Sequence, residues 1–166
     1  MENKEMERGQ AAFLLAQLGA HAADRFAQRL GALQLSPADA GILRLLRMAA
    51  GISQQELSVR LQLHPSRLVA ILDNLERRQL VERKPNPQDR RLYSLHLTNE
   101  GREILGQIGK LAREHQEALL SALSGEDRTK LAELLQRVAD EQGLTRGVHP
   151  GYQRLGKLKP ADLQPS

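Results

Sequence analysis

The residues that can do chemistry gather near the middle of the chain, in the stretch NPQDRRLYSLHLT, residues 86–98. Asp89, Arg90 and Arg91 stand in a row in a turn that contains prolines, and the next residues alternate apolar and polar as in a strand. A guanidinium at a hairpin tip suits the narrow minor groove of duplex DNA, where negative potential is concentrated. The Asp89 carboxylate can pair with a neighbouring arginine and fix its rotamer, so that less side-chain entropy is lost on binding.

A second group of candidate residues lies on a predicted helix over residues 64–78. Its buried face is formed by apolar side chains at helical spacing, namely Leu68, Ile71, Leu72 and Leu75. A helix of this kind fits the major groove of DNA, which is about 12 Å wide. Ser66 and Arg67 carry hydrogen-bonding groups for base edges, whereas the apolar side chains on this face can only touch a thymine methyl. The candidate contacts with DNA on this helix are Pro65, Ser66, Arg67, Val69, Ala70, Asn74 and Arg77.

The elements that must position these residues are mostly helical. Apolar periodicity and capping signals predict further helices over residues 10–31, from Ser36 to about Ala49, from Ser53 to near Leu61, from Thr98 to about Leu123, and from Ser124 to about Gln142. Three of these starts have the spacing of a capping box, at residues 36–39, 53–56 and 124–127. Two short strands are predicted, from Val81 to Lys84 and from Leu92 to Leu97.

Two short helices joined by a tight turn and followed by a hairpin predict a mainly α fold of the winged helix-turn-helix type, with a two-stranded wing. We expect one domain over residues 1–142, with a DNA-binding lobe at about 36–98. The long helices at about 10–31 and 98–142 are expected to be dimerisation helices, because a single subunit cannot cover their leucine-rich stripes. Residues 143–166 contain four Gly and three Pro and are expected to form a basic tail without regular structure.

Composition narrows the possible partners. The chain has 166 residues and a net charge of +4, and seven basic against four acidic side chains fall within residues 64–91. Aromatic residues make up only 2 %, too few for stacking on single-stranded bases, so duplex DNA is the favoured nucleic acid. The absence of Cys excludes thiolate metal sites and thiol-based sensing. No apolar run is long enough for a membrane span and no signal peptide is evident, so a cytoplasmic protein without a membrane partner is expected.

The run LVAILDNLERRQLVERKPNPQDRRLYSLHLTNEG, residues 68–101, resembles the signature of MarR-type transcriptional regulators. The order of helices agrees with that family over residues 10–142. The resemblance implies a homodimer that binds a palindromic operator, usually as a repressor. It also implies a small-molecule effector, commonly a phenolic or other aromatic acid, and no other cofactor. The Asp-x-Arg motif of the family falls on Asp89 and Arg91, which makes Arg91 the expected minor-groove side chain.

The sequence departs from the family at two places. Gln79 stands where the family usually has Gly in a positive-φ conformation, which costs about 1 kcal/mol if the same geometry is kept. Val69 and Ala70 stand where relatives often have polar or basic residues, so the operator sequence of a relative does not transfer to this chain.

Other interpretations stay open. The winged helix can serve as a protein-interaction module without specific DNA binding, and it then has no need for the arginines of the wing. The histidines lack the spacing of metal ligands, and no catalytic motif is evident, so neither a metal site nor an enzyme is expected. His21 is a candidate for lining an effector cleft. Four basic residues are equally compatible with phosphate contacts and with plain surface charge, namely Arg77, Arg78, Arg83 and Lys84.

Overall fold

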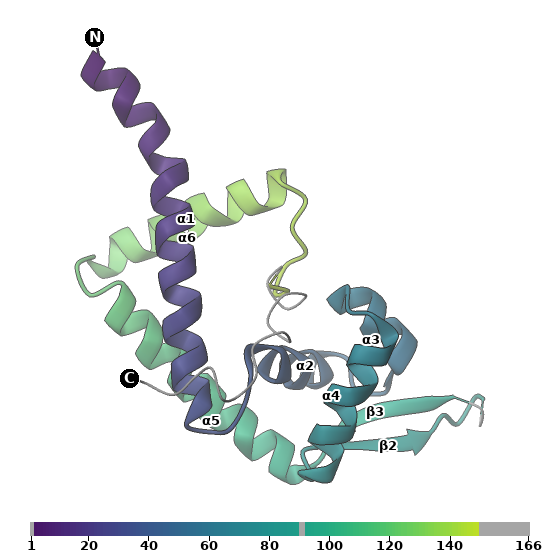
Figure 1. Cartoon of the computed structure of the whole chain (residues 1–166). Helices are drawn as coiled ribbons and strands as arrows, with labels where there is room; N and C mark the ends of the chain where they lie inside the picture. The colour runs from purple at the N-terminus through teal and green to yellow at the C-terminus, as the bar shows by residue number, and fades with distance from the viewer. Residues whose placement is uncertain (1, 90–91, 150–166) are drawn as a thin grey trace.

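The computed structural model describes residues 2–89 and 92–149, with side chains from residue 10 onward. The elements in chain order are α1 (Glu2–Gly31), α2 (Pro37–Met48), β1 (Ile52–Ser53), α3 (Gln54–Leu61), α4 (Pro65–Arg77), β2 (Val81–Pro85), β3 (Tyr93–Leu97), α5 (Asn99–Leu119) and α6 (Gly125–Glu141). Helices α2, α3 and α4 and the β2–β3 hairpin gather at one end of the long helices, while the N-terminal half of α1 projects away from them (Figure 1). The prediction of a mainly α winged-helix fold is confirmed.

The helices start where capping residues satisfy their first amides. The Ser36 side chain accepts from Asp39 N, and the Asp39 carboxylate accepts from Ser36 N at 2.7 Å, which completes the predicted capping box of α2. Ser53 and Ser124 also accept the expected bond from the residue three positions on. At α3 the carboxylate of Glu56 pairs with the side chain of Arg60 at 2.6 Å. The partner that orients Glu56 is therefore one helical turn further along the same helix.

Two predicted boundaries were wrong. Helix α1 begins at Glu2 rather than near residue 10, because the preceding segment is rich in Glu, Lys, Met and Arg, which are good helix formers. Helix α5 ends at Leu119 rather than near Leu123. The Arg128 side chain donates from Nε to the carbonyls of Leu120 and Leu123 at 3.0 and 3.1 Å and so stabilises the turn after α5.

The sheet has three strands in the order β1-β3-β2, all antiparallel, whereas only the two strands of the wing were predicted. Strand β1 is two residues long and pairs with β3 through Ile52 opposite Leu95. A strand this short carries no periodic pattern, and it forms because β3 offers it a partner from 41 to 43 residues further along the chain. It ties the start of α3 to the base of the wing.

The hydrophobic core lies between α2, α3, α4, the sheet and the ends of α1 and α5 that face them. Its fully buried members include Ile42, Leu46, Leu57, Leu72 and Leu95. Strand alternation points Leu95 and Leu97 of β3 into this core. The core therefore holds α4 and the wing in one rigid arrangement.

The junction between α4, the sheet and α5 explains the segment TNEG, residues 98–101. Thr98 caps α5 by accepting from Gly101 N, and its hydroxyl donates to Gln79 O at 2.6 Å. A Cβ on Gly101 would lie 2.0 Å from Leu80 O, so only glycine allows α5 to start this close to the α4–β2 turn. Gln79 has φ +60°, so the positive-φ geometry expected from the family is kept without the glycine.

The first part of the predicted tail packs against the rest of the chain. After α6, Gly143 adopts φ +68° and Leu144 N donates to Ala139 O, which ends the helix in a left-handed turn. Val148 is partly buried against the core, next to Phe26. Residues 143–149 contain no helix or strand, as predicted, and residues 150–166 lie outside the described residues.

Candidate nucleic-acid interface

Helix α4 has one buried and one open face, as its sequence predicts. Leu68, Leu72 and Leu75 are fully buried. Among the predicted contact residues, Pro65, Ser66, Ala70 and Arg77 are exposed, and Arg67, Val69 and Asn74 are half-buried. The structure therefore brings all seven together on or beside the surface that α4 presents to solvent.

The first turn of α4 is capped by a histidine, a residue that was not predicted as a cap. His64 is the N-cap, and its Nδ1 accepts weakly from Ser66 N at 3.4 Å and lies 2.8 Å from Ser66 Oγ. When Nδ1 acts as the acceptor, the Ser66 hydroxyl donates to it and keeps its lone pairs for a donor outside the helix. The signal in the sequence was Pro65, because proline favours the first helical position and the residue directly before it is then the N-cap.

The wing is the β2–β3 hairpin, and its pairing is regular up to Pro85 opposite Tyr93. Beyond that pair, Asn86 N donates to Leu92 O at 2.8 Å, and the Asn86 side chain accepts from Gln88 N at 2.9 Å. These bonds order the start of the turn, and Asp89 is exposed. The predicted contact residues Arg90 and Arg91 lie outside the described residues.

An ion-pair cluster joins the wing to helix α4. Arg83 on β2 donates to Asp73 at 2.7 Å and to Glu76, both on α4, and its side chain is only 18 % exposed. Burial alone would lower the pKa of Arg83, but the hydrogen bonds and charges of Asp73 and Glu76 outweigh it and raise the pKa. Arg83 therefore fixes the angle between α4 and the wing and is engaged within the protein.

The other basic residues left open by the sequence also differ from one another. Arg78 donates to Gln34 O at 2.7 Å and to Leu33 O at 3.1 Å, and so fastens the end of α4 to the α1–α2 link. Lys84 pairs with Glu82 at 2.7 Å. Arg77 is exposed on the last turn of α4. Strand alternation was the available signal for Arg83, because it shares the inward face of β2 with Val81.

Two hollows lie away from the α4 surface. One is a groove of about 540 Å³ between α2, the wing and the start of α5, and the other, of about 340 Å³, is lined by residues of α1, α2 and segment 147–149. The lining of the second includes Ala23 and Phe26 but not His21, so the structure does not bring this candidate to a described cavity. Within the described part of the chain no group of three or more His, Asp or Glu is placed to hold a metal ion. No helix in that part has the length and apolar character to cross a bilayer.

Helix α4 buries one face against the core, and an ion-pair cluster holds it at a fixed angle to the β-hairpin. This arrangement defines the winged-helix class of proteins. Comparison with known proteins narrows the class. The model of the MarR family matches residues 33–92. The chain is 34 % identical to the multiple antibiotic resistance protein MarR of Escherichia coli K12 over 111 residues, which is 66 % of this chain and 76 % of that protein. This chain belongs to the MarR family.

Two further relatives have names that describe a role in transcription. It is 31 % identical to a putative transcriptional regulatory protein for the hcr operon of Thauera aromatica, over 63 % of each chain, so the match spans less than two thirds of that relative. The structure of the transcriptional repressor CouR bound to a 23-mer DNA duplex superposes with a TM-score of 0.68 at 32 % identity, covering 77 % of this chain and 91 % of CouR. The relatives are regulators of transcription by name.

Proposed function

We propose that this protein is a sequence-specific, double-stranded-DNA-binding regulator of transcription that acts as a ligand-responsive repressor. The observation that carries the proposal is the solvent-exposed face of α4, since the opposite face of this helix is fixed in the core by fully buried leucines. A helix fixed in this way can enter the major groove with Ser66, Arg67 and Asn74 toward base edges, while Val69 and Ala70 contact thymine methyls. Pro65 and Arg77 then lie at the two ends of the same helix, beside the phosphate backbones.

The wing supplies the second contact. With α4 in the major groove, the hairpin extends along the duplex toward the adjacent minor groove, where Arg91 inserts and Arg90 binds phosphate. Asp89 orients the inserted arginine. This assignment follows the Asp-x-Arg motif of the family.

The protein acts as a homodimer in this proposal. Several apolar side chains of α1 and α6 are exposed in the single chain, among them Phe13 at 64 %, Leu18 at 54 % and Val138 at 50 %. An apolar surface of this kind marks a protein–protein interface. Two α4 helices then reach successive major grooves of a palindrome, with half-site centres about 10–10.5 base pairs apart.

The remaining expectations follow from the role. A regulator of this kind catalyses no reaction and works in the cytoplasm, where its DNA is. Its effector is a phenolic or aromatic acid by family resemblance, and no other cofactor is required. The rival candidate is a winged-helix interaction module, which would bind a protein through the same surface without reading DNA.

Selection of duplexes from a random library, followed by hydroxyl-radical footprinting, tests the proposal. We expect a palindromic sequence that is protected on one face, with the half-site spacing given above. A library that yields no sequence preference after repeated rounds would favour the interaction module. Protection of one isolated half-site by a monomer would overturn the dimeric mode.

Arginine at the wing tip provides the sharpest single-residue test. Replacing Arg91 by Ala is expected to weaken binding to the selected operator by about 1–3 kcal/mol. Lys130→Ala on the exposed side of α6, remote from the wing, is the matched loss of one positive charge. Equal affinities of the two variants would mean that the tip makes no specific contact.

A further inference from the structure

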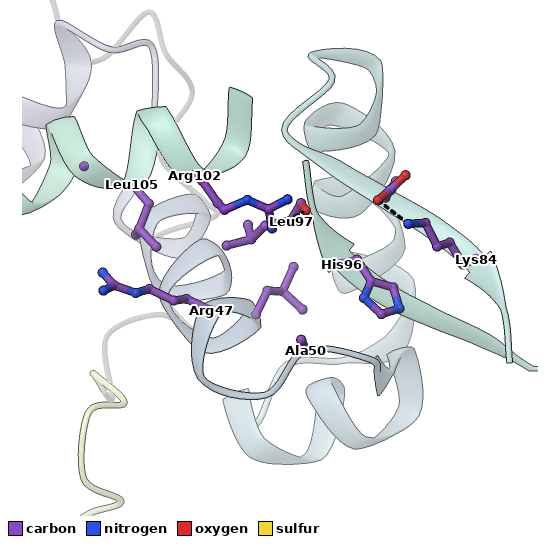
Figure 2. A pocket seen from close by; sticks show the side chains of 10 residues that line it. Arg47, Ala50, Lys84, His96, Leu97, Arg102 and Leu105 are labelled. Atoms are coloured by element: carbon purple, nitrogen blue, oxygen red, sulfur yellow. Dashed lines mark hydrogen bonds and ion pairs between the residues drawn. The ribbon is translucent and has the colours of Figure 1, made fainter. Parts of the chain in front are cut away.

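The start of α4 holds a hydrogen-bonded pair, His64 and Ser66, on the surface that is proposed to enter the major groove. Both residues are exposed, and His64 Nδ1 lies 2.8 Å from Ser66 Oγ. The pair lies apart from the groove behind the wing, which Figure 2 shows and which residues of α2, the link after it, the wing and α5 line. The direction of the hydrogen bond between the two side chains decides what the hydroxyl of Ser66 can recognise.

The backbone of the first turn fixes that direction. Pro65 has no N–H. The amides of Arg67 and Leu68 both donate to His64 O, at 3.0 and 3.1 Å. These bonds leave Ser66 N as the remaining amide of the turn, and it donates to His64 Nδ1 at 3.4 Å. Because an amide can only donate, Nδ1 carries a lone pair, and the proton of the neutral ring is on Nε2.

The hydroxyl of Ser66 therefore donates its single proton to His64. If Nδ1 carried the proton instead, the N–H of the ring would face the amide N–H of Ser66, and two donors would meet without an acceptor between them. With its proton engaged in this way, Ser66 Oγ presents only lone pairs to a partner outside the helix. A serine hydroxyl without such an acceptor rotates and can serve both donors and acceptors.

We propose that His64 is a positioning residue that makes Ser66 recognise exocyclic amino groups in the major groove. This inference rests on the proposed function, because it concerns the same helix in the same groove. Adenine and cytosine present an amino donor on that edge, whereas thymine and guanine present a carbonyl oxygen. A carbonyl oxygen that faces the lone pairs of Ser66 is repelled and loses its hydrogen bond with water. One position in each half-site is therefore adenine or cytosine on the contacted strand, and thymine or guanine is disfavoured there.

Operator duplexes that differ at a single base pair test this assignment. The operator selected from the random library is varied at each position of both half-sites, and fluorescence anisotropy gives the affinity of each duplex at one salt concentration. We expect one position in each half-site at which the amino bases bind about tenfold more tightly than the keto bases, which is the size of one mismatch. Ser66→Ala should lose the preference at that position and keep the preferences elsewhere.

His64→Ala separates positioning from contact. Without an acceptor at residue 64 the Ser66 hydroxyl turns freely and can donate to a carbonyl oxygen, so the ratio of amino to keto affinities should fall toward one. His64→Asn should restore the ratio of the wild type, because an amide oxygen can accept from the same two groups and Asn is a good N-cap. Loss of the cap in His64→Ala lowers its affinity for every duplex alike, and the ratio cancels this loss.

Ser53→Ala is the matched control for the loss of a cap. Ser53 caps α3 in the same lobe by accepting from Glu56 N at 3.1 Å, so this variant also weakens the start of a helix. Its ratio of amino to keto affinities should stay at the value of the wild type. Melting curves verify that each variant is folded.

The position of the ring proton can be measured without DNA. Long-range proton–nitrogen NMR spectra of the free protein, recorded at about pH 8.5 where imidazoles are neutral, should place the proton of His64 on Nε2. His64→Asn identifies the signal, because it is missing from the spectrum of that variant.

Three results would overturn this inference while the proposed function stands. They are selective operator binding without an amino preference that depends on Ser66, a ratio unchanged in His64→Ala, or a ring proton of His64 on Nδ1. A library that yields no sequence preference at all would overturn the proposed function, and the inference would fall with it.

Discussion

The half of the molecule around the sheet and the half formed by the outer helices are built on different principles. Helices α2, α3 and α4 enclose the core with the sheet, and its members are at most 8 % exposed. By contrast, no residue of α6 is buried, and residues 10–29 of α1 are exposed or half-exposed. The first half buries a core within one chain, whereas the second half leaves an apolar face of the kind that marks a protein–protein interface.

The polar contacts follow the same division. Around the sheet, Arg78 and Arg83 bind groups that are 44 or 45 and 7 or 10 positions away in the sequence, and so join separate elements. On α6 the pair Lys130–Glu133 stays within one helical turn, and Arg128 reaches only the helix that directly precedes it, at Glu117 of α5. The comparison shows that side-chain contacts hold α4 and the wing at a fixed angle to each other.

The largest expected effect concerns the rigid half. Gly101→Ala places a methyl group 2.0 Å from Leu80 O, and because that atom is backbone, α5 must shift. We expect a loss of about 3 kcal/mol in the free energy of unfolding, measured by urea denaturation at fixed protein concentration. Gly106→Ala in the same helix meets no atom and should stabilise by about 0.5–1 kcal/mol. A similar stability for both variants would contradict the close approach.

The next effect concerns the open half. Val138→Asp puts a charge on the apolar face of α6 and should weaken dimerisation by about 2 kcal/mol or more. Sedimentation equilibrium should show a shift toward monomer, while the circular dichroism of the helices is largely retained. Glu133→Ala, an exposed change on the same helix, is the control. An unchanged dimer in Val138→Asp would move the interface elsewhere.

A smaller effect separates structural from DNA-binding arginines. Arg83→Ala leaves Asp73 and Glu76 without their cation, and because both are at least 41 % exposed we expect a cost of only about 1 kcal/mol in stability. The dependence of operator affinity on salt concentration should keep its slope, since Arg83 is engaged within the protein. A slope that falls by about one unit would instead make Arg83 a phosphate contact.

The smallest expected effect is the pH dependence of the free energy of unfolding that arises from His115 on α5. Burial lowers the pKa of His115, and the positive charges of Arg29 and His21 lower it further. A histidine with a lower pKa in the folded than in the unfolded state stabilises the protein least when it is protonated, so stability is full above about pH 6.5 and falls as the pH drops below it. Urea midpoints at pH 7.5 and 5.5 should differ less in His115→Gln than in the wild type. An equal drop in both would assign the titration to another group.

Much of the fold follows from local patterns, and what was missed depends on contacts between distant segments. Caps and apolar spacing located α2, α3 and α4, because these signals act within a few residues. Strand β1 and the role of Arg78 depend on partners some 40 residues away, which no local pattern reports.

The candidate interface was predictable to a similar degree. The open face of α4 follows from helical periodicity, and all seven candidates lie on or beside it. The distinction between Arg83 and the arginines proposed to meet DNA required the position of α4 relative to β2. The assignments of Arg90 and Arg91 stay predictions, as does that of His21.

One titration tests the central claim that two chains, each with its α4 and wing, bind together to one DNA duplex. Fluorescence anisotropy at physiological salt compares the affinity for the DNA upstream of the protein's own gene with the affinity for a scrambled duplex of equal length. We expect a preference of about a thousandfold or more for the native duplex, with two chains per site. Equally weak binding to both duplexes, or saturation at one chain per site, would contradict the account.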